Sequence, residues 1–257
     1  MYLSPIVDAH LHITGNGEWF TGKHNASVEL LLEQMDAGGV AKGIIMGLAQ
    51  LNQNEYLRRI CEEHSGTLYA MAGFNPITEE LAAVRDYLSH KTFRGIKLHP
   101  RRDNFSPTDP KALAVYEEAE EKGWAINFDV FGHSLHLPIE ELRPTVFDRL
   151  AKKFPNLKMV LSHCCVPWML EAFFVAKSNP NLYLDCSFII ERFNKTSVMQ
   201  DLLYTAKHLD RKLIFGSDFP EEQVHRYLSM AKIEFKDLQE EKKSNIFGLN
   251  AIQVYGL

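Results

Sequence analysis

The run Asp8-Ala9-His10-Leu11-His12 carries two imidazoles two positions apart near the amino end of the chain. It follows Ser4-Pro5-Ile6-Val7, an apolar stretch that reads as a short buried strand. Since side chains alternate along a strand, Asp8, His10 and His12 are expected to point to the same side. Two imidazoles about 7 Å apart at their Cα atoms can converge on one divalent metal ion. The spacing therefore predicts a metal site, with two histidines of a polar loop as the alternative interpretation.

Polar side chains that can bind a metal or move a proton also follow the later apolar runs. They are Lys97 and His99, Asn127 and Asp129, His163, Asp185, and Asp218. If the runs are parallel strands of one barrel, their carboxyl ends meet at one rim, where such barrels place their active sites. The sequence thus predicts one polar site built from several strand ends.

Short apolar runs alternate with longer amphipathic segments along the whole chain. Strands are predicted at 4–7, 43–46, 68–71, 95–98, 125–128, 158–161, 182–184 and 212–215. Helices are predicted from Val28 to the Gly38-Gly39 pair, with Ser27 as N-cap, and at 53–64, 78–90, 110–123, 144–153, 167–178, 196–208 and 221–232. A last short helix at 245–251 is expected to close one end of the barrel.

Eight strand–helix units in 257 residues predict a single-domain (β/α)8 TIM barrel that spans residues 1–257. The competing fold is a doubly wound open sheet. That fold normally has a glycine-rich turn after its first strand, and none is present here.

Composition and charge exclude several classes of protein. The chain is 46% hydrophobic and has a formal net charge of -5, which disfavours binding to nucleic acid. No apolar run approaches the roughly 20 residues that cross a membrane, and Met1-Tyr2-Leu3-Ser4 lacks the features of a signal peptide. The cysteines Cys61, Cys164, Cys165 and Cys186 lack the spacing of a disulfide framework. We therefore expect a cytoplasmic protein.

Four motifs in the same order resemble the amidohydrolase superfamily, and its amidohydrolase-related branch most closely. They are Asp8-Ala9-His10-Leu11-His12, Arg94-Gly95-Ile96-Lys97-Leu98-His99-Pro100, Phe154-Pro155-Asn156-Leu157-Lys158 leading into Leu161-Ser162-His163, and Gly216-Ser217-Asp218-Phe219-Pro220. The resemblance extends over nearly the whole chain. That branch holds metal-dependent decarboxylases and lactonase-like hydrolases.

The resemblance implies a role for each matching residue. His10 and His12 would be metal ligands, and Asp218 would be both a ligand and the group that exchanges a proton with the activated water. His163 would bind or polarise the substrate, or ligate a second metal. The cofactor implied is a divalent metal, with zinc as the expected ion and manganese as the alternative. These roles agree with the chemistry of metal-activated water beside a carboxylate.

The chain departs from the family pattern at Asp129, where the family usually has a ligand histidine. An aspartate oxygen can replace imidazole on zinc, so Asp129 is a candidate fourth ligand. Its added negative charge would favour a harder metal such as manganese. The alternatives are a turn carboxylate at Asp129, with His133 reaching in from the loop.

Several nearby residues are candidates for substrate contact. Lys97 could hold an anionic substrate group or a neighbouring carboxylate, or form a carbamylated bridge between two metals as in some superfamily members. His99 could line the pocket. Arg101 and Arg102 could recognise a carboxylate, although a solvated charge at the rim is the favoured interpretation. Four aromatic residues could form an apolar pocket wall or part of the core: Trp19, Phe20, Phe131 and Phe188.

The predicted function is a metal-dependent hydrolase in which metal-activated water attacks an ester, lactone or amide of a small molecule. The alternative is a metal-dependent, non-oxidative decarboxylase of a small aromatic or unsaturated acid. A further alternative is a catalytically degenerate barrel that acts as a binding protein. A small-molecule substrate is the expected partner, and a homodimer is a common form for such a protein.

Overall fold

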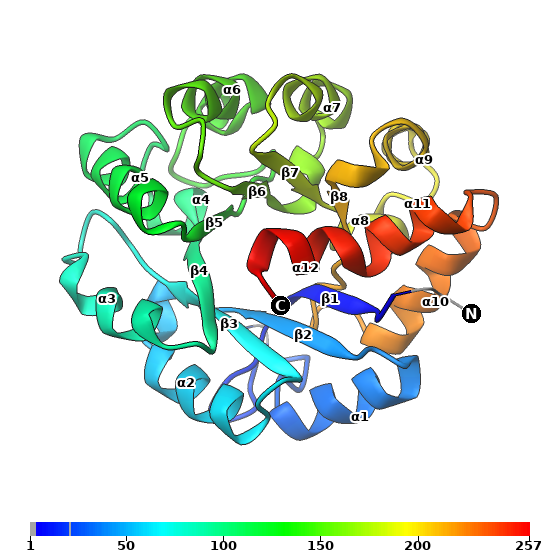
Figure 1. Cartoon of the computed structure of the whole chain (residues 1–257), viewed down its shortest axis with the longest axis horizontal. Helices are drawn as coiled ribbons and strands as arrows, with labels where there is room; N and C mark the ends of the chain where they lie inside the picture. Colours follow the sequence, from blue (N-terminus) through cyan, green and yellow to red (C-terminus); the bar gives the residue numbers. More distant parts are fainter. Residues whose placement is uncertain (1–3, 21) are drawn as a thin grey trace.

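Eight parallel strands surround the centre of the molecule, and helices surround the strands (Figure 1). The structure is a computed structural model that describes residues 4–20 and 22–257, so Met1 to Leu3, considered above for targeting, lie outside it. Each strand pairs with the next in sequence order: β1(Val7–Leu11), β2(Lys42–Met46), β3(Leu68–Gly73), β4(Phe93–Leu98), β5(Ala125–Phe128), β6(Met159–Leu161), β7(Leu182–Asp185) and β8(Leu213–Ile214). The predicted (β/α)8 TIM barrel is confirmed.

Each predicted helix is present with ends shifted by a few residues, and the described residues also form three short helices that were not predicted, at 100–103, 189–192 and 240–244. Their bounds are α1(Val28–Gly38), α2(Asn54–Glu63), α3(Ala82–Ser89), α4(Pro100–Asp103), α5(Pro110–Lys122), α6(Pro144–Lys153), α7(Met169–Ser178), α8(Ile189–Arg192), α9(Ser197–His208), α10(Val224–Glu234), α11(Glu240–Ser244) and α12(Asn250–Tyr255). Ser27 caps α1 by accepting a hydrogen bond from the backbone N–H of Leu30, as predicted. Asp109 caps α5 in the same way, through the N–H of Lys111.

The first strand differs from its prediction. It begins at Val7 rather than Ser4, and it contains the motif from Asp8 to Leu11. Pro5 has no backbone N–H to donate to a strand ladder, which disfavours pairing before it. The polar residues Asp8 and His10 are fully buried within the strand.

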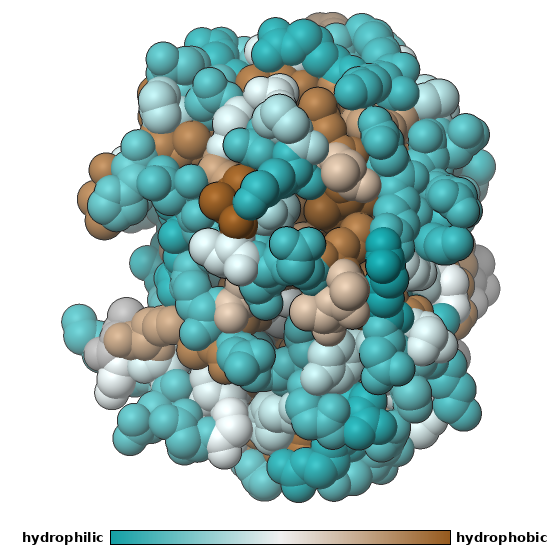
Figure 2. Space-filling model, turned by 90° about the vertical axis from the view of Figure 1, so that its left-hand side faces the viewer, coloured by the Kyte–Doolittle hydropathy of each residue, from teal (hydrophilic) through white to brown (hydrophobic). Residues whose placement is uncertain are grey.

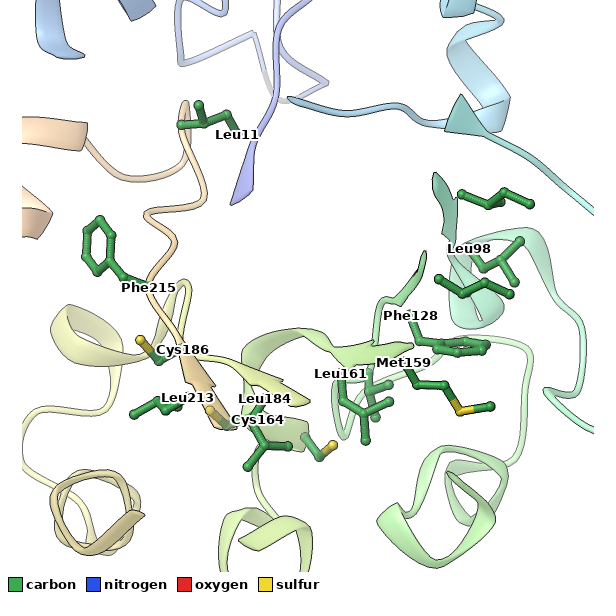
Figure 3. Close-up of a cluster of buried hydrophobic side chains, with 14 of the residues drawn as sticks. Leu11, Leu98, Phe128, Met159, Leu161, Cys164, Leu184, Cys186, Leu213 and Phe215 are labelled. Atoms are coloured by element: carbon green, nitrogen blue, oxygen red, sulfur yellow. The ribbon is translucent and has the colours of Figure 1, made fainter. Parts of the chain in front are cut away.

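Side chains of the strands form two apolar layers. In Figure 3 the labelled side chains, among them Leu184, Leu161 and Phe215, point away from the ring of strands toward the helices. A second buried cluster joins strand residues such as Val160 and Ile214 with three residues of α12: Ala251, Val254 and Tyr255. Helix α12 lies across one end of the barrel in Figure 1, and a π-helical segment at Asn245–Leu249 leads into it, so the predicted closing helix at 245–251 is confirmed.

The seam between β1 and the segment after β8 closes the barrel and positions the polar motif. The N–H of Asp218 donates to the carbonyl of His10 at 2.9 Å, and the N–H of His12 donates to that of Phe219 at 2.7 Å. Asp8 Oδ1 accepts from the N–H of Ser217 at 2.9 Å and from that of His10 at 3.2 Å. Burial raises the pKa of Asp8 to about 7. The seam therefore brings Asp218 beside the two histidines, although about 200 residues separate them in sequence.

Gly95 in β4 allows strands β4 and β5 to approach closely. Its φ is +151°, and a Cβ added there would lie 2.0 Å from the carbonyl oxygen of Ala125. Gly95→Ala is expected to lower the free energy of unfolding by about 3 kcal/mol or more, because the clash is with backbone. Gly123→Ala is the control: its φ is +72° but a Cβ would meet no atom within 4 Å, so about 1 kcal/mol is expected. Urea unfolding measures both, and equal losses would contradict the prediction.

One face of the molecule is mostly polar. The side of the molecule that carries α3 and α5 faces the viewer in Figure 2, and hydrophilic side chains cover most of it. Among the described residues, none of the helices has the length and apolar character needed to cross a membrane.

Candidate metal centre

His10, His12 and Asp218 form a buried cluster at the barrel seam. Each offers one ligand atom, and these three atoms lie within 4.8 Å of one another. Asp218 Oδ1 is 3.4 Å from Nε2 of His10 and 3.5 Å from Nε2 of His12. The structure thus brings together three of the four predicted metal ligands. Asp8 takes no part in this cluster, since its carboxylate binds the seam backbone.

The other ring nitrogen of each histidine has a fixed partner. His10 Nδ1 lies 2.5 Å from Asp185 Oδ2, and His12 Nδ1 lies 2.9 Å from the carbonyl oxygen of Met46. Both partners are acceptors, so each Nδ1 carries the proton and each Nε2 keeps a free lone pair. Burial lowers the pKa of His10 to about 4, which favours the neutral ring that a metal requires.

The free Nε2 of His10 provides a test of whether a metal fits. This atom is buried and has no hydrogen-bond partner, and such orphaned polar atoms are costly in a protein interior. A divalent ion between His10, His12 and Asp218 would satisfy it. Two imidazoles and one carboxylate with a fourth position open is the donor set of many catalytic zinc sites. These residues therefore fit a divalent metal ion.

The side chains around Asp218 favour its ionised form. Burial opposes its charge, but the surrounding His12, His10 and His163 hold the pKa of its carboxyl well below the ordinary value. Its backbone has a φ of +76°, a conformation that is strained for most residues other than glycine. His163, the other predicted catalytic residue, also has a left-handed backbone, with φ +56°. Such strain is concentrated at functional sites, which supports both assignments.

His163 lies between the metal cluster and Asp129. Its ring centroid is 5.1 Å from that of His10. Its Nδ1 is 3.0 Å from Ser187 Oγ, and its Nε2 is 3.3 Å from Asp129 Oδ2. His163 is buried and lines the cavity, so the structure brings it to the site as predicted from the sequence.

Asp129 is not in the cluster of candidate ligands. Arg101 Nε donates to its Oδ1 at 2.5 Å, and His99 Nε2 lies 3.2 Å from its Oδ2. Burial opposes ionisation, but Arg101, His99 and His163 hold the pKa of Asp129 well below its ordinary value. The favoured interpretation of Arg101 as a solvated rim charge is wrong, because it pairs with a buried carboxylate. His133 contributes only its backbone carbonyl, which accepts from Arg101.

Lys97 lies apart from the cavity beside the metal cluster. Its side chain is buried, and its ammonium donates to Asn127 Oδ1 at 2.6 Å and to Ser162 Oγ at 3.1 Å. Burial lowers the pKa of Lys97. It is not among the residues that line the cavity, whereas His99 is.

The cavity beside the cluster has a volume of about 200 Å³, which suits a small molecule. It is lined by His12, Trp19, Leu48, His99, Arg101, Arg102, Asp129, Phe131, His163, Phe188, Asp218 and Glu221. The ring of Trp19 lies 5.1 Å from that of His12 and donates its Nε1–H to Glu221 at 2.6 Å. Three of the four predicted aromatic wall residues therefore line the cavity, while Phe20 packs against Trp19 outside it.

A family model described as amidohydrolase (Amidohydro_2) matches residues 7–257. The chain belongs to the amidohydrolase family. Members of this family typically depend on a metal, which agrees with the cluster of His10, His12 and Asp218. No curated protein matches the sequence.

Solved structures with the same barrel include hydrolase-type and decarboxylase members. An uncharacterised TIM-barrel protein of Bordetella bronchiseptica is 20% identical over 98% of this chain and 99% of its own, with a TM-score of 0.82. An amidohydrolase of Burkholderia multivorans with bound zinc is 12% identical over 99% and 100%, with a TM-score of 0.78. 5-Carboxyvanillate decarboxylase of Sphingomonas paucimobilis is 13% identical over 98% and 99%, with a TM-score of 0.76. At these identities the likeness shows the fold alone.

Asp185 is the residue of this amidohydrolase site to which the sequence assigns no role. Asp185 is the last residue of β7, and the sequence identified it as a carboxylate at a strand end. The sequence could not show its contact with His10, because the two residues are 175 positions apart.

Asp185→Asn is expected to weaken zinc affinity 10- to 100-fold, because the carboxylate of Asp185 fixes the orientation of the His10 ring and raises its basicity. Competition with a chromogenic chelator measures the affinity. Asp148→Asn, on the outer helix α6, is the control, and equal affinities in both variants would contradict this role.

Proposed function

We propose that this amidohydrolase hydrolyses an ester, lactone or amide of a small molecule at the site of His10, His12 and Asp218. Zinc is the expected ion there, with manganese as the alternative. The observation that supports this most is the position of Asp218 Oδ1, within 3.5 Å of both free Nε2 atoms and at the edge of the cavity. The carboxylate of Asp218 can then bind the ion and also accept a proton from the reacting water.

His10, His12 and Asp218 would hold a divalent ion, which would lower the pKa of a water and polarise a substrate carbonyl. Asp218 accepts the proton of the attacking water and donates it to the leaving oxygen or nitrogen. His163, across the cavity, stabilises the negative charge that develops on the carbonyl oxygen. Trp19, Phe131 and Phe188 line the cavity and limit the access of bulk water to the reacting groups.

The test uses zinc-reconstituted protein and a panel of lactones, aryl esters and anilides in water enriched in oxygen-18. Mass spectrometry of the acid product is expected to show one oxygen-18 atom per turnover. A parallel panel of aromatic and unsaturated acids is assayed for carbon dioxide. Release of carbon dioxide without any hydrolysis would support the decarboxylase alternative instead. Stoichiometric metal without turnover on either panel would support a binding protein.

A further inference from the structure

Asp129 has almost no capacity left for a metal ion. A carboxylate offers about four lone-pair positions on its two oxygens. Arg101 occupies Oδ1 at 2.5 Å, and the imidazole nitrogens of His99 and His163 approach Oδ2 at 3.2 and 3.3 Å. The carboxylate is 95% buried. The sequence makes Asp129 a candidate fourth ligand, but these contacts favour a different role.

The charges around Asp129 also disfavour metal binding by this carboxylate. Arg101 is oriented toward it by a second hydrogen bond to the carbonyl of His133 and by packing on the ring of Phe131, at 5.3 Å from the guanidinium carbon. A buried ion pair of this kind neutralises the carboxylate. A neutralised carboxylate attracts a metal cation less than a free one does.

His163 must present an N–H group to this carboxylate. Its Nε2 is hydrogen-bonded to Asp129 Oδ2, and it carries the proton because the carboxylate oxygen can only accept. His163 Nε2 is therefore a donor. A protonated Nε2 cannot ligate a metal, so the geometry also disfavours a second metal on His163 through this atom.

We propose that Asp129 binds no metal and is a positioning residue, which holds the Nε2–H group of His163 at the cavity wall while Arg101 neutralises its charge. The claim that Asp129 binds no metal rests on these contacts alone. The claim that Asp129 positions a group used in catalysis rests on the proposed function. The 3.3 Å separation between His163 and Asp129 is longer than the 2.7–2.9 Å typical of a charge-assisted bond. The His163 N–H is therefore available to be shared with a substrate oxygen that enters the cavity.

The first experiment measures zinc binding and kinetics of Asp129→Asn, which keeps the size of the side chain. Zinc content after dialysis is expected to match that of the wild type, while kcat falls by a factor of about 10² with KM changed less. The control is Glu171→Gln, which removes the carboxylate of an exposed arginine pair with Arg143, and it should leave both values unchanged. Loss of zinc in Asp129→Asn would make Asp129 a ligand and overturn the proposal, and so would an unchanged kcat.

Asp129→Ala tests the positioning role in a second way. The deleted carboxylate leaves Arg101, His99 and His163 around a small space, so added formate is expected to restore at least a tenth of the lost rate. Formate should do nothing for the wild type. Absence of rescue in a variant that folds and binds zinc would count against the positioning role.

A third measurement needs no variant and no turnover. Nitrogen NMR of the wild type, labelled with nitrogen-15 in histidine and titrated with zinc, reports each ring separately. The Nε2 signals of His10 and His12 should shift on zinc binding, while Nε2 of His163 keeps its proton. Loss of the proton from His163 Nε2 with added zinc would overturn the proposal even if the protein proved to have no hydrolase activity.

Discussion

Asp218→Asn is expected to lower kcat by a factor of about 10³ while leaving the fold intact. The amide of asparagine cannot accept a proton from the attacking water, and it is a weaker metal ligand than a carboxylate. The fold should survive because asparagine tolerates the left-handed backbone that Asp218 adopts, with φ +76°. Steady-state kinetics measure the rate, and thermal unfolding checks the fold.

Asp86→Asn on α3 is the control for this substitution, since Asp86 is exposed on an outer helix. It should retain the wild-type rate. A rate within about twofold of the wild type in Asp218→Asn would contradict the proton-accepting role of Asp218 and with it the proposed reaction.

Removal of the metal has the second large expected effect. A ligand that binds only the folded state at a thousand times its Kd stabilises by about 4 kcal/mol. For a chain of this size that corresponds to roughly 10 °C in Tm. Treatment with a chelator should therefore lower Tm by about this amount and abolish turnover, and added zinc should restore both.

His12→Ala extends the same prediction. This variant lacks one of the three ligand side chains, so its Tm should not respond to zinc or to chelator in the range that affects the wild type. His208→Ala, an exposed histidine on α9, should respond as the wild type does. A zinc-dependent Tm shift of equal size in His12→Ala would show that the ion binds elsewhere.

Much of the barrel could be predicted from local patterns. Apolar runs of four or so residues separated by amphipathic segments determine strands and helices, and the caps at Ser27 and Asp109 act within three residues of their helices. The first strand was predicted to begin at Ser4 but begins at Val7. The partners of the buried Asp8 and His10, Ser217 and Asp185, lie far away in sequence, so local patterns could not identify them.

The candidate site could be predicted only in part for the same reason. His10, His12 and Asp218 follow from strand-end positions and from the family resemblance. The tautomers of the two histidines depend on Asp185 and on the Met46 carbonyl, which no motif marks. From the sequence, Arg101 was interpreted as a solvated charge at the rim. Its contact with Asp129 forms only in the folded barrel. Interactions between strand ends are set by barrel closure, which spacing along the chain does not encode.

Metal stoichiometry of the purified protein tests the metal centre most directly. Elemental analysis after reconstitution and dialysis is expected to give one zinc or manganese ion per chain in the wild type and in Asp129→Asn, and none in His12→Ala. No stoichiometric metal in the wild type after reconstitution with either ion would contradict a metal centre at His10, His12 and Asp218.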